Sequence, residues 1–260
     1  MQQNVQTANL SEETVHREVS PLDIAIQRAQ TALLKRQDRT GFWCGELQGD
    51  SILESEYILL RFMLNQEDER ELPKITNYLR SLQQPHGGWS LYPGGAPDLS
   101  GTVKAYFALK LMGDDPNAPH MQKAREVILK LGGAERCNSF SKFYLSGLGQ
   151  IPYSACPIVP PEIVLLPHWA YFNLYAVSAW TRTMILPLAI TTIFKPVRKL
   201  PPERGIRELF LIDPDKCPVS SSGEPPRGWH RFFLFVDRLL KLYEHSPIKP
   251  LRKLSLKKAE

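Results

Sequence analysis

A short pattern that occurs twice limits what this chain can fold into more than any other feature of its sequence. The pattern is Q-x-x-x-G-x-W, and its two copies lie 46 residues apart: Gln37, Gly41 and Trp43, then Gln83, Gly87 and Trp89. The likeness continues beyond each tryptophan, because residues 57–63 align with residues 106–112. Repeats of this length made of two helices bury their apolar faces against neighbouring repeats. The expected fold is therefore all-α, an α-solenoid or a closed αα-toroid.

The residue types in the pattern indicate a structural role. A glycine at a helix end supplies a positive φ, and a glutamine amide can satisfy backbone groups left free there. A tryptophan adds a large plate that packs over the connector. Proton transfer needs none of these groups, so we interpret each copy as a helix-end staple. Both tryptophans are then expected to be buried, and replacing either with alanine to cost about 3–5 kcal/mol of stability.

Helical spacing of apolar residues predicts most of the first half of the chain. Ser20, Pro21 and Asp23 form a helix start, and further helices are expected over 72–82, 99–112 and 121–131. A capping box, Ser51-x-x-Glu54, predicts the start of the second helix. No alternating strand pattern is evident.

The second half is rich in proline, which predicts short helices joined by stiff connectors. Residues 169–194 are apolar enough to suggest a membrane span. Arg182 and Pro187 interrupt this segment, and a span needs about 20 unbroken apolar residues. A pair of buried helices is the favoured interpretation.

Charge and cysteine content narrow the function classes. The formal net charge is +5, and residues 241–260 hold six Lys or Arg against two Glu. A near-neutral body with a basic end argues against a nucleic-acid surface and favours a solvated tail or contact with anionic lipid. The four cysteines lie far apart, without zinc-ligand spacing, so we expect a reduced, cytosolic chain with no metal and no cofactor. Residues 1–20 are polar and are expected to form a disordered lead-in.

Several elements, in this order, resemble the N-terminal part of the squalene–hopene cyclases. They are the paired repeats, Glu54-Ser55-Glu56-Tyr57, residues 91–99, Pro160-Pro161-Glu162-Ile163 and residues 178–182, and the likeness runs from about Pro21 to Lys253. The resemblance implies two stacked αα-barrels that enclose a linear triterpene. Such enzymes protonate the substrate, and aromatic faces stabilise the carbocations that follow.

The initiating acid of that family is a D-x-D-D motif in the half that follows this region, and this sequence departs from it. The nearest pattern runs from Asp213 to Lys216, and we interpret it as a surface turn. The resemblance therefore implies an isomerase-type triterpene cyclase portion with no catalytic residue of its own.

The resemblance also implies roles for individual residues. Trp180 would line the cyclisation cavity, and Val177 and Ile185 would stand at the entrance channel for substrate. Glu56 would point inward and support the polar network behind the acid. The alternatives are that the first three are ordinary core residues and that Glu56 is a solvated or capping glutamate.

Residues 228–247 predict a helix with a wide apolar stripe, edged by basic residues, that is typical of a helix lying in a bilayer interface. In the family the equivalent helix is the membrane anchor around the entrance for squalene. A helix packed in a groove is the alternative. The residues expected to contact the membrane are Trp229, Phe232, Phe233, Val236, Leu239 and Leu240.

These inferences combine into one expectation. Residues 21–247 form an αα-toroid (α/α barrel), incomplete relative to the two-barrel cyclase, with a lead-in at 1–20 and a basic tail at 248–260. The chain contributes to cyclisation of squalene or a similar isoprenoid in hopanoid or triterpenoid biosynthesis. It is peripheral on the cytoplasmic side of a membrane and needs a second chain that carries the catalytic half. The alternatives are a non-catalytic lipid-binding or scaffold protein, and a zinc-dependent prenyltransferase-like toroid, for which no ligand set is visible.

Overall fold

The computed structural model describes residues 20–44, 50–171, 173–220 and 227–259. The chain divides into two compact units, Met1–Gln48 and Gly49–Glu260. Regular structure in the described residues is helical, and strand-like pairing is limited to one isolated bridge between Ser90 and Pro97. This confirms the all-α class.

The first unit contains α1, Pro21–Arg36, which begins where the sequence predicts. The Ser20 hydroxyl accepts a hydrogen bond from the Asp23 backbone N–H at 3.1 Å, and the Asp23 carboxylate accepts one from the Ser20 N–H at 3.1 Å. This reciprocal pair satisfies two backbone donors at the helix start. The apolar residues of α1 remain exposed, and no residue of this helix is buried.

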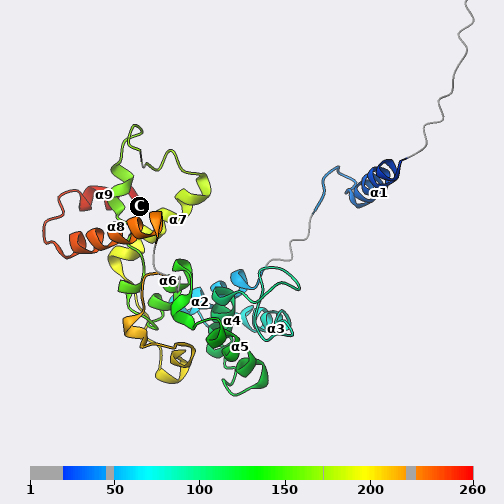
Figure 1. Ribbon diagram of the computed structural model, residues 1–260, viewed down its shortest axis with the longest axis horizontal. Helices are drawn as coiled ribbons and strands as arrows, with labels where there is room; N and C mark the ends of the chain where they lie inside the picture. Colours follow the sequence, from blue (N-terminus) through cyan, green and yellow to red (C-terminus); the bar gives the residue numbers. More distant parts are fainter. Residues whose placement is uncertain (1–19, 45–49, 172, 221–226, 260) are drawn as a thin grey trace, which may run out of the picture. The chain divides into compact units, whose positions relative to one another are not determined.

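The second unit is built around α4, Leu99–Leu111 (Figure 1). Nearly every residue of this helix is buried. Three helices pack against it: α2 (Ile52–Met63), α3 (Leu72–Ser81) and α5 (Pro119–Lys130). A further helix, α6 (Ser139–Gly147), packs on α2. The core side chains come from all of these helices and include Ile58, Leu79, Phe107 and Ile128.

The start of α2 differs from the sequence-based expectation. Ser51 makes no side-chain capping bond, so the predicted capping box is wrong. The Asp50 carboxylate instead accepts a hydrogen bond from the Ile52 N–H at 2.9 Å. Asp50, and not Ser51, therefore caps the first turn of α2. The spacing of Ser51 and Glu54 does not show which of the two neighbouring residues will form the cap.

Both copies of Q-x-x-x-G-x-W staple a helix end with the same hydrogen bonds. In the second copy Gln83 Nε2 donates to the Gly87 carbonyl at 2.6 Å, and the Trp89 indole N–H donates to the Leu79 carbonyl at 2.9 Å. The first copy repeats these contacts at 2.7 Å each, from Gln37 to the Gly41 carbonyl and from Trp43 to the Leu33 carbonyl. The central glycines share a φ of +93° to +96°. In each copy the tryptophan is hydrogen-bonded to the end of the preceding helix, and the glutamine is hydrogen-bonded to the turn that follows that helix.

The two tryptophans differ in burial. Trp89 is 1% exposed, whereas Trp43 is 50% exposed, so the expectation that both are buried is wrong for Trp43. Trp89 lies inside the second unit, where α5 packs against its motif through His120 and Lys123. The hydrogen bonds of the motif are local, whereas the burial of its tryptophan depends on which other helix packs against the motif.

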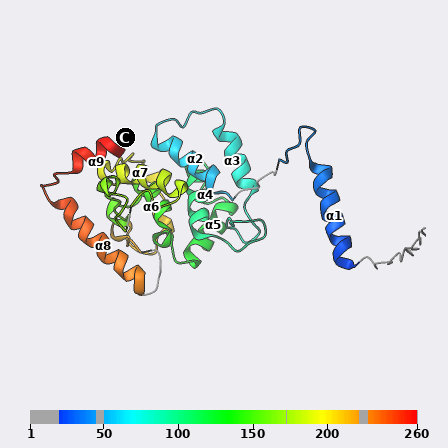
Figure 2. The same ribbon diagram turned by 90° about the horizontal axis from the view of Figure 1, so that it is seen from above.

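The proline-rich half contains α7 (Ala179–Phe194), α8 (Gly228–His245) and α9 (Arg252–Ala259). In Figure 2, α8 runs along an outer edge of the unit, away from α3 and α5. The connections contain short 3-10 helices, as the prolines indicate. They are η1 (Ala134–Arg136), η2 (Tyr153–Ala155), η3 (Pro161–Leu165), η4 (Pro202–Arg204), η5 (Arg207–Leu209) and η6 (Pro214–Lys216).

Residues 169–194 do not form the expected pair of buried helices. The described part of 169–178 consists of turns and bends, and α7 follows with only Ala189 and Thr192 buried. The apolar composition of this segment therefore does not reflect packing inside the second unit. Among the described residues, no helix has the length and apolar character needed to cross a membrane.

Two further expectations concern the C-terminal region. Asp213 and Asp215 are exposed on the single turn that contains η6, which confirms the surface turn. Residues 252–259, expected to belong to a basic tail, form α9 and pack against η3. The helix is held because Arg252 finds two carboxylates, as described below. The expected lead-in at residues 1–19 lies outside the described residues.

Candidate functional site

The inward side of α8 is polar. Asp237 is buried, and one of its carboxylate oxygens accepts a hydrogen bond from the Ile158 N–H at 2.8 Å. Lys241, one turn later, pairs with the other carboxylate oxygen at 2.7 Å and donates to the Ser154 carbonyl at 2.8 Å. These contacts attach the helix to the segment that contains η2 through charged groups.

The outward side of α8 is mainly aromatic and aliphatic, and Arg231 and Arg238 are also exposed on this helix. Trp229, Phe232 and Phe233 contact one another, with ring centroids 5.5–6.1 Å apart. Val236 and Leu240, two other members of the predicted stripe, are half-buried. A surface helix usually buries its apolar side chains and exposes its charged ones. In α8 an ion pair lies on the buried side and aromatic rings lie on the exposed side. The apolar side chains of α8 that are 46–71% exposed are Trp229, Phe232, Phe233, Phe235, Leu239 and Leu242.

An apolar groove lies at the start of α8. It has a volume of about 630 Å³ and is lined by Tyr171, Gly228, Trp229 and Phe232. The groove is wide open to solvent, so it is a surface feature and not an enclosed cavity. Groove and helix face together form one aromatic, solvent-facing surface, which we call the α8 face: the groove residues and the exposed apolar side chains of α8.

Arg252 fastens α9 to both α8 and η3. Its guanidinium reaches Glu244 of α8 at 2.5 Å and Glu162 of η3 at 2.8 Å, and all three side chains are less than 20% exposed. Burial alone would raise the pKa of Glu244, but the hydrogen bonds and charge of Arg252 outweigh it and lower that pKa. We call this group the Arg252 clamp: Arg252, Glu162 and Glu244.

Replacing Arg252 with glutamine should lower the free energy of unfolding by about 1.5–3 kcal/mol, because hydrogen bonds to charged groups are lost from a largely buried site. The folded-state pKa of Glu244 is depressed below 4.5, so the contribution of the clamp is present above that pH and disappears as the pH falls further. Urea titrations at neutral and acidic pH measure both effects. The difference between the two proteins should shrink at acidic pH, and a constant difference would contradict the assigned ion pairs.

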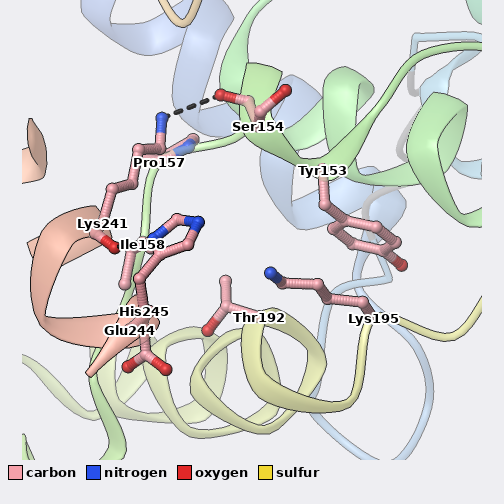
Figure 3. Close-up of a pocket in the computed structure, with 9 residues that line it drawn as sticks. All are labelled: Tyr153, Ser154, Pro157, Ile158, Thr192, Lys195, Lys241, Glu244 and His245. Atoms are coloured by element: carbon pink, nitrogen blue, oxygen red, sulfur yellow. Dashed lines mark hydrogen bonds between the residues drawn. The ribbon is translucent and has the colours of Figure 1, made fainter. Parts of the chain in front are cut away.

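A smaller pocket lies behind α8, between η2 and the ends of α7 and α8 (Figure 3). Its volume is about 160 Å³, below the usual range for small-molecule sites. Figure 3 shows the Lys195 side chain extending into it from the end of α7, opposite His245. His245 Nδ1 and Lys241 Nζ already contact backbone carbonyls. This pocket is too small to enclose a long apolar chain.

Glu56 of α2 lies in a polar cluster with side chains of α4 and α6. One carboxylate oxygen contacts Lys104 Nζ of α4 at 2.6 Å, and the other accepts a hydrogen bond from the Tyr144 hydroxyl of α6 at 3.4 Å. Lys104 is 1% exposed, so the pair is mostly shielded from water. Burial, followed by the charge of Glu56, raises the pKa of Tyr144 to about 12, which keeps its hydroxyl a neutral donor.

The other residues assigned by resemblance lie in or just before α7. Trp180 is 74% exposed at the first turn of that helix, and Val177 and Ile185 are half-buried. The contacts made by Glu56 come from α4 and α6, so the structure places it in a separate cluster. The motif residues Gln37 and Gln83 serve the staples described above.

Comparison with known proteins identifies the family. Residues 26–260 match the squalene–hopene cyclase N-terminal domain. The chain belongs to this family. It is 43% identical to a probable squalene–hopene cyclase of Sinorhizobium fredii, over 92% of this chain and 37% of the relative. It is also 43% identical to a squalene–hopene cyclase of Zymomonas mobilis, over 84% of this chain and 33% of the relative.

Similarity extends to a dammaradiene synthase of Dryopteris crassirhizoma, at 34% identity over 92% of this chain and 35% of the relative. The chain thus spans about a third of the length of the curated relatives it matches. The helical structure is that of the αα-toroid domain expected from the repeats.

Sequence analysis missed the groups that orient α8. Asp237 and Lys241 are four residues apart and of opposite charge, a spacing that places them on one helical face. That signal was available. The partners Ile158, Ser154 and Glu162 are distant in sequence, and no local pattern connects them to α8 or α9.

Proposed function

We propose that this chain supplies the membrane-facing and substrate-channel part of a squalene–hopene-type triterpene cyclase. Membership of the family supports the reaction class, because curated relatives from two bacteria are squalene–hopene cyclases. The observation that carries the membrane-facing part of the proposal is the α8 face, an aromatic surface turned away from the protein. The chain spans about a third of those relatives, so the activity of the whole enzyme is part of the proposal.

Squalene is a linear hydrocarbon with no polar group, and it reaches an enzyme from the bilayer rather than from water. The apolar groove at the start of α8 would receive it at the membrane surface. In this proposal Val177 and Ile185 border the entrance channel beyond the groove. Trp180 belongs to the cavity, where an indole face stabilises a passing carbocation by about 2 kcal/mol or more when desolvated.

The proton that starts cyclisation would come from outside this chain. Protonating an alkene needs a strong, positioned acid, and the sequence contains no D-x-D-D motif. Glu56 is ion-paired with Lys104 and accepts a hydrogen bond from Tyr144, so its oxygens act as acceptors. We propose that Glu56 supports the polar wall of the cavity and that a second chain, or the part of the family sequence that this chain does not span, provides the acid.

The proposed position is peripheral, on the cytoplasmic side of a membrane, with α8 lying in the interface. A helix that inserts one face reaches about 5–10 Å into the boundary between headgroups and acyl chains. The exposed lysines of α9, Lys253, Lys257 and Lys258, would then attract anionic headgroups.

The purified chain alone should not convert squalene into a cyclic product, because the acid is supplied elsewhere. Turnover should appear when the chain is mixed with a folded fragment of the Zymomonas mobilis relative that lacks the matched third. Gas chromatography with mass spectrometry detects the product, and heat-treated mixtures serve as the control. A cyclised product from this chain alone would refute the assignment of the acid.

A non-catalytic lipid-binding or scaffold role is the second candidate. The α8 face favours it independently, since a membrane-binding surface requires no reaction. The complementation experiment separates the two functions: vesicle binding together with no turnover in the mixture would favour the lipid-binding role.

A further inference from the structure

Lys142 of α6 is a fully buried cation. It is 0% exposed, and its ammonium donates hydrogen bonds to three successive backbone carbonyls, those of Pro218 at 2.6 Å, Val219 at 3.3 Å and Ser220 at 3.4 Å. Burying a charge is costly, and burial lowers the pKa of the Lys142 ammonium. An apolar side chain of similar length would fill the same space without this cost, so the ammonium is needed for the carbonyls that it binds.

Other polar groups lie near Lys142 but do not take the place of the carbonyls. Burial raises the pKa of the Cys137 thiol to about 12 and also raises that of Cys217, so both thiols are neutral at physiological pH. Glu135, which is 6% exposed, contributes a favourable charge. Three carbonyl oxygens that converge on one point repel one another unless a cation lies between them. The conformation of residues 218–220 therefore depends on Lys142.

Ser220 contacts the first turn of α8. Its hydroxyl lies 3.3 Å from Nε2 of His230, which is hydrogen-bond distance, and His230 directly follows Trp229, one of the groove residues. The later turns of α8 are fastened separately, through Asp237 and the Arg252 clamp. Lys142 is thus linked to the groove end of α8 and not to the end that the clamp holds.

We infer that Lys142 is a positioning residue for the apolar groove at the start of α8. By gathering the carbonyls of residues 218–220, its ammonium places the Ser220 hydroxyl against His230, and this contact holds the first turn of α8. The Lys142 side chain itself lies inside the protein and does not touch a ligand in the groove. The inference rests on the proposed function in one respect, since that function makes the groove the entrance for a hydrocarbon chain.

Amide hydrogen exchange of the full chain, followed by mass spectrometry, measures how firmly each end of α8 is held. The amides of residues 232–236 are the first in α8 that donate to carbonyls within the helix, and residues 241–245 form its last turns. Lys142→Met removes the ammonium and keeps an unbranched side chain. It should speed exchange at 232–236 about tenfold or more and change exchange at 241–245 less than about twofold, because only the groove end is released.

Lys110→Met is the matched control. The Lys110 side chain is 8% exposed, and its ammonium also donates to a backbone carbonyl, that of Gly205, and pairs with Glu208 at 2.6 Å. These contacts join α4 to the segment that contains η5 and not to α8. The substitution therefore removes a comparable buried cation, but it should leave exchange at residues 232–236 unchanged.

Ser220→Ala tests the same link without disturbing the buried charge. It removes the hydroxyl that meets His230 and should also speed exchange at residues 232–236. Unchanged exchange there in Lys142→Met would overturn the inference, and Ser220→Ala decides in the same way if the lysine variant does not fold. An equal acceleration along the whole of α8 would also overturn it, because that result indicates only a loss of overall stability.

Turnover separates the inference from the proposed function. In the complementation mixture, Lys142→Met should raise the KM for squalene about tenfold and change kcat less than about twofold, because it alters entry and not the chemical step. Faster exchange at residues 232–236 with no turnover by the wild-type mixture would support the positioning of α8 and remove the proposed function. Turnover with the same KM for both proteins would retain the reaction and overturn the positioning of the groove for substrate entry.

Discussion

Replacing Trp89 with alanine is expected to lower the free energy of unfolding by about 3–5 kcal/mol, the usual cost of deleting a fully buried aromatic ring. The ring is 1% exposed, and its indole N–H donates to the Leu79 carbonyl at 2.9 Å. The same replacement at Trp43 should cost about 2 kcal/mol. That side chain is half-exposed, so its loss removes about half of the ring burial together with one hydrogen bond.

Urea titrations of the two variants, followed by circular dichroism, provide the measurement. Trp89→Phe serves as a control, because it keeps most of the buried ring and deletes the indole N–H. It should lie between the wild-type protein and Trp89→Ala. Equal losses for Trp43→Ala and Trp89→Ala would mean that Trp43 is covered in solution, contrary to its exposure in the structure.

The contrast between these tryptophans explains which parts of the fold the sequence predicts. The staple is made within ten residues, from Leu79 to Trp89 and from Leu33 to Trp43, and such contacts are encoded by spacing alone. The capping box failed for a related reason, because Asp50 competes for the first turn of α2. Burial depends on a neighbour such as α5, and a motif does not specify its neighbour.

In the candidate site, too, local features were predictable from the sequence and contacts between distant residues were not. A helical apolar stripe predicted α8 and most of its exposed side chains. The direction in which the helix faces was not predictable, because it is set by contacts of Asp237 and Lys241 with residues 79 and 87 positions away. Residues 252–259, expected to be a tail, form α9 because of another contact between residues that are distant in sequence. Arg252 reaches Glu162, 90 residues earlier, and no local signal predicts that pair.

The α8 face leads to the prediction with the largest effect on localisation. The triple substitution of Phe232, Phe233 and Leu239 by serine should release the protein from neutral and anionic vesicles alike. These residues are about half-exposed, and full burial of such a side chain contributes about 1.5–3 kcal/mol. The remaining area of three residues is then worth about 2–4.5 kcal/mol, a change of roughly 50-fold to 2,000-fold in the partition coefficient.

Binding is measured by flotation of the protein with vesicles in a density gradient. Two sets of substitutions serve as controls. Serine at Leu53, Phe140 and Leu211, which are exposed elsewhere in the second unit, should leave binding unchanged. Glutamine at Lys253, Lys257 and Lys258 should weaken binding only to anionic vesicles, because each lysine near such a surface contributes about 1 kcal/mol and none on a neutral one. Wild-type protein that fails to float with either vesicle type would remove the membrane assignment. The α8 face would then have to be covered by protein, and the chain's access to a hydrocarbon substrate would need another route.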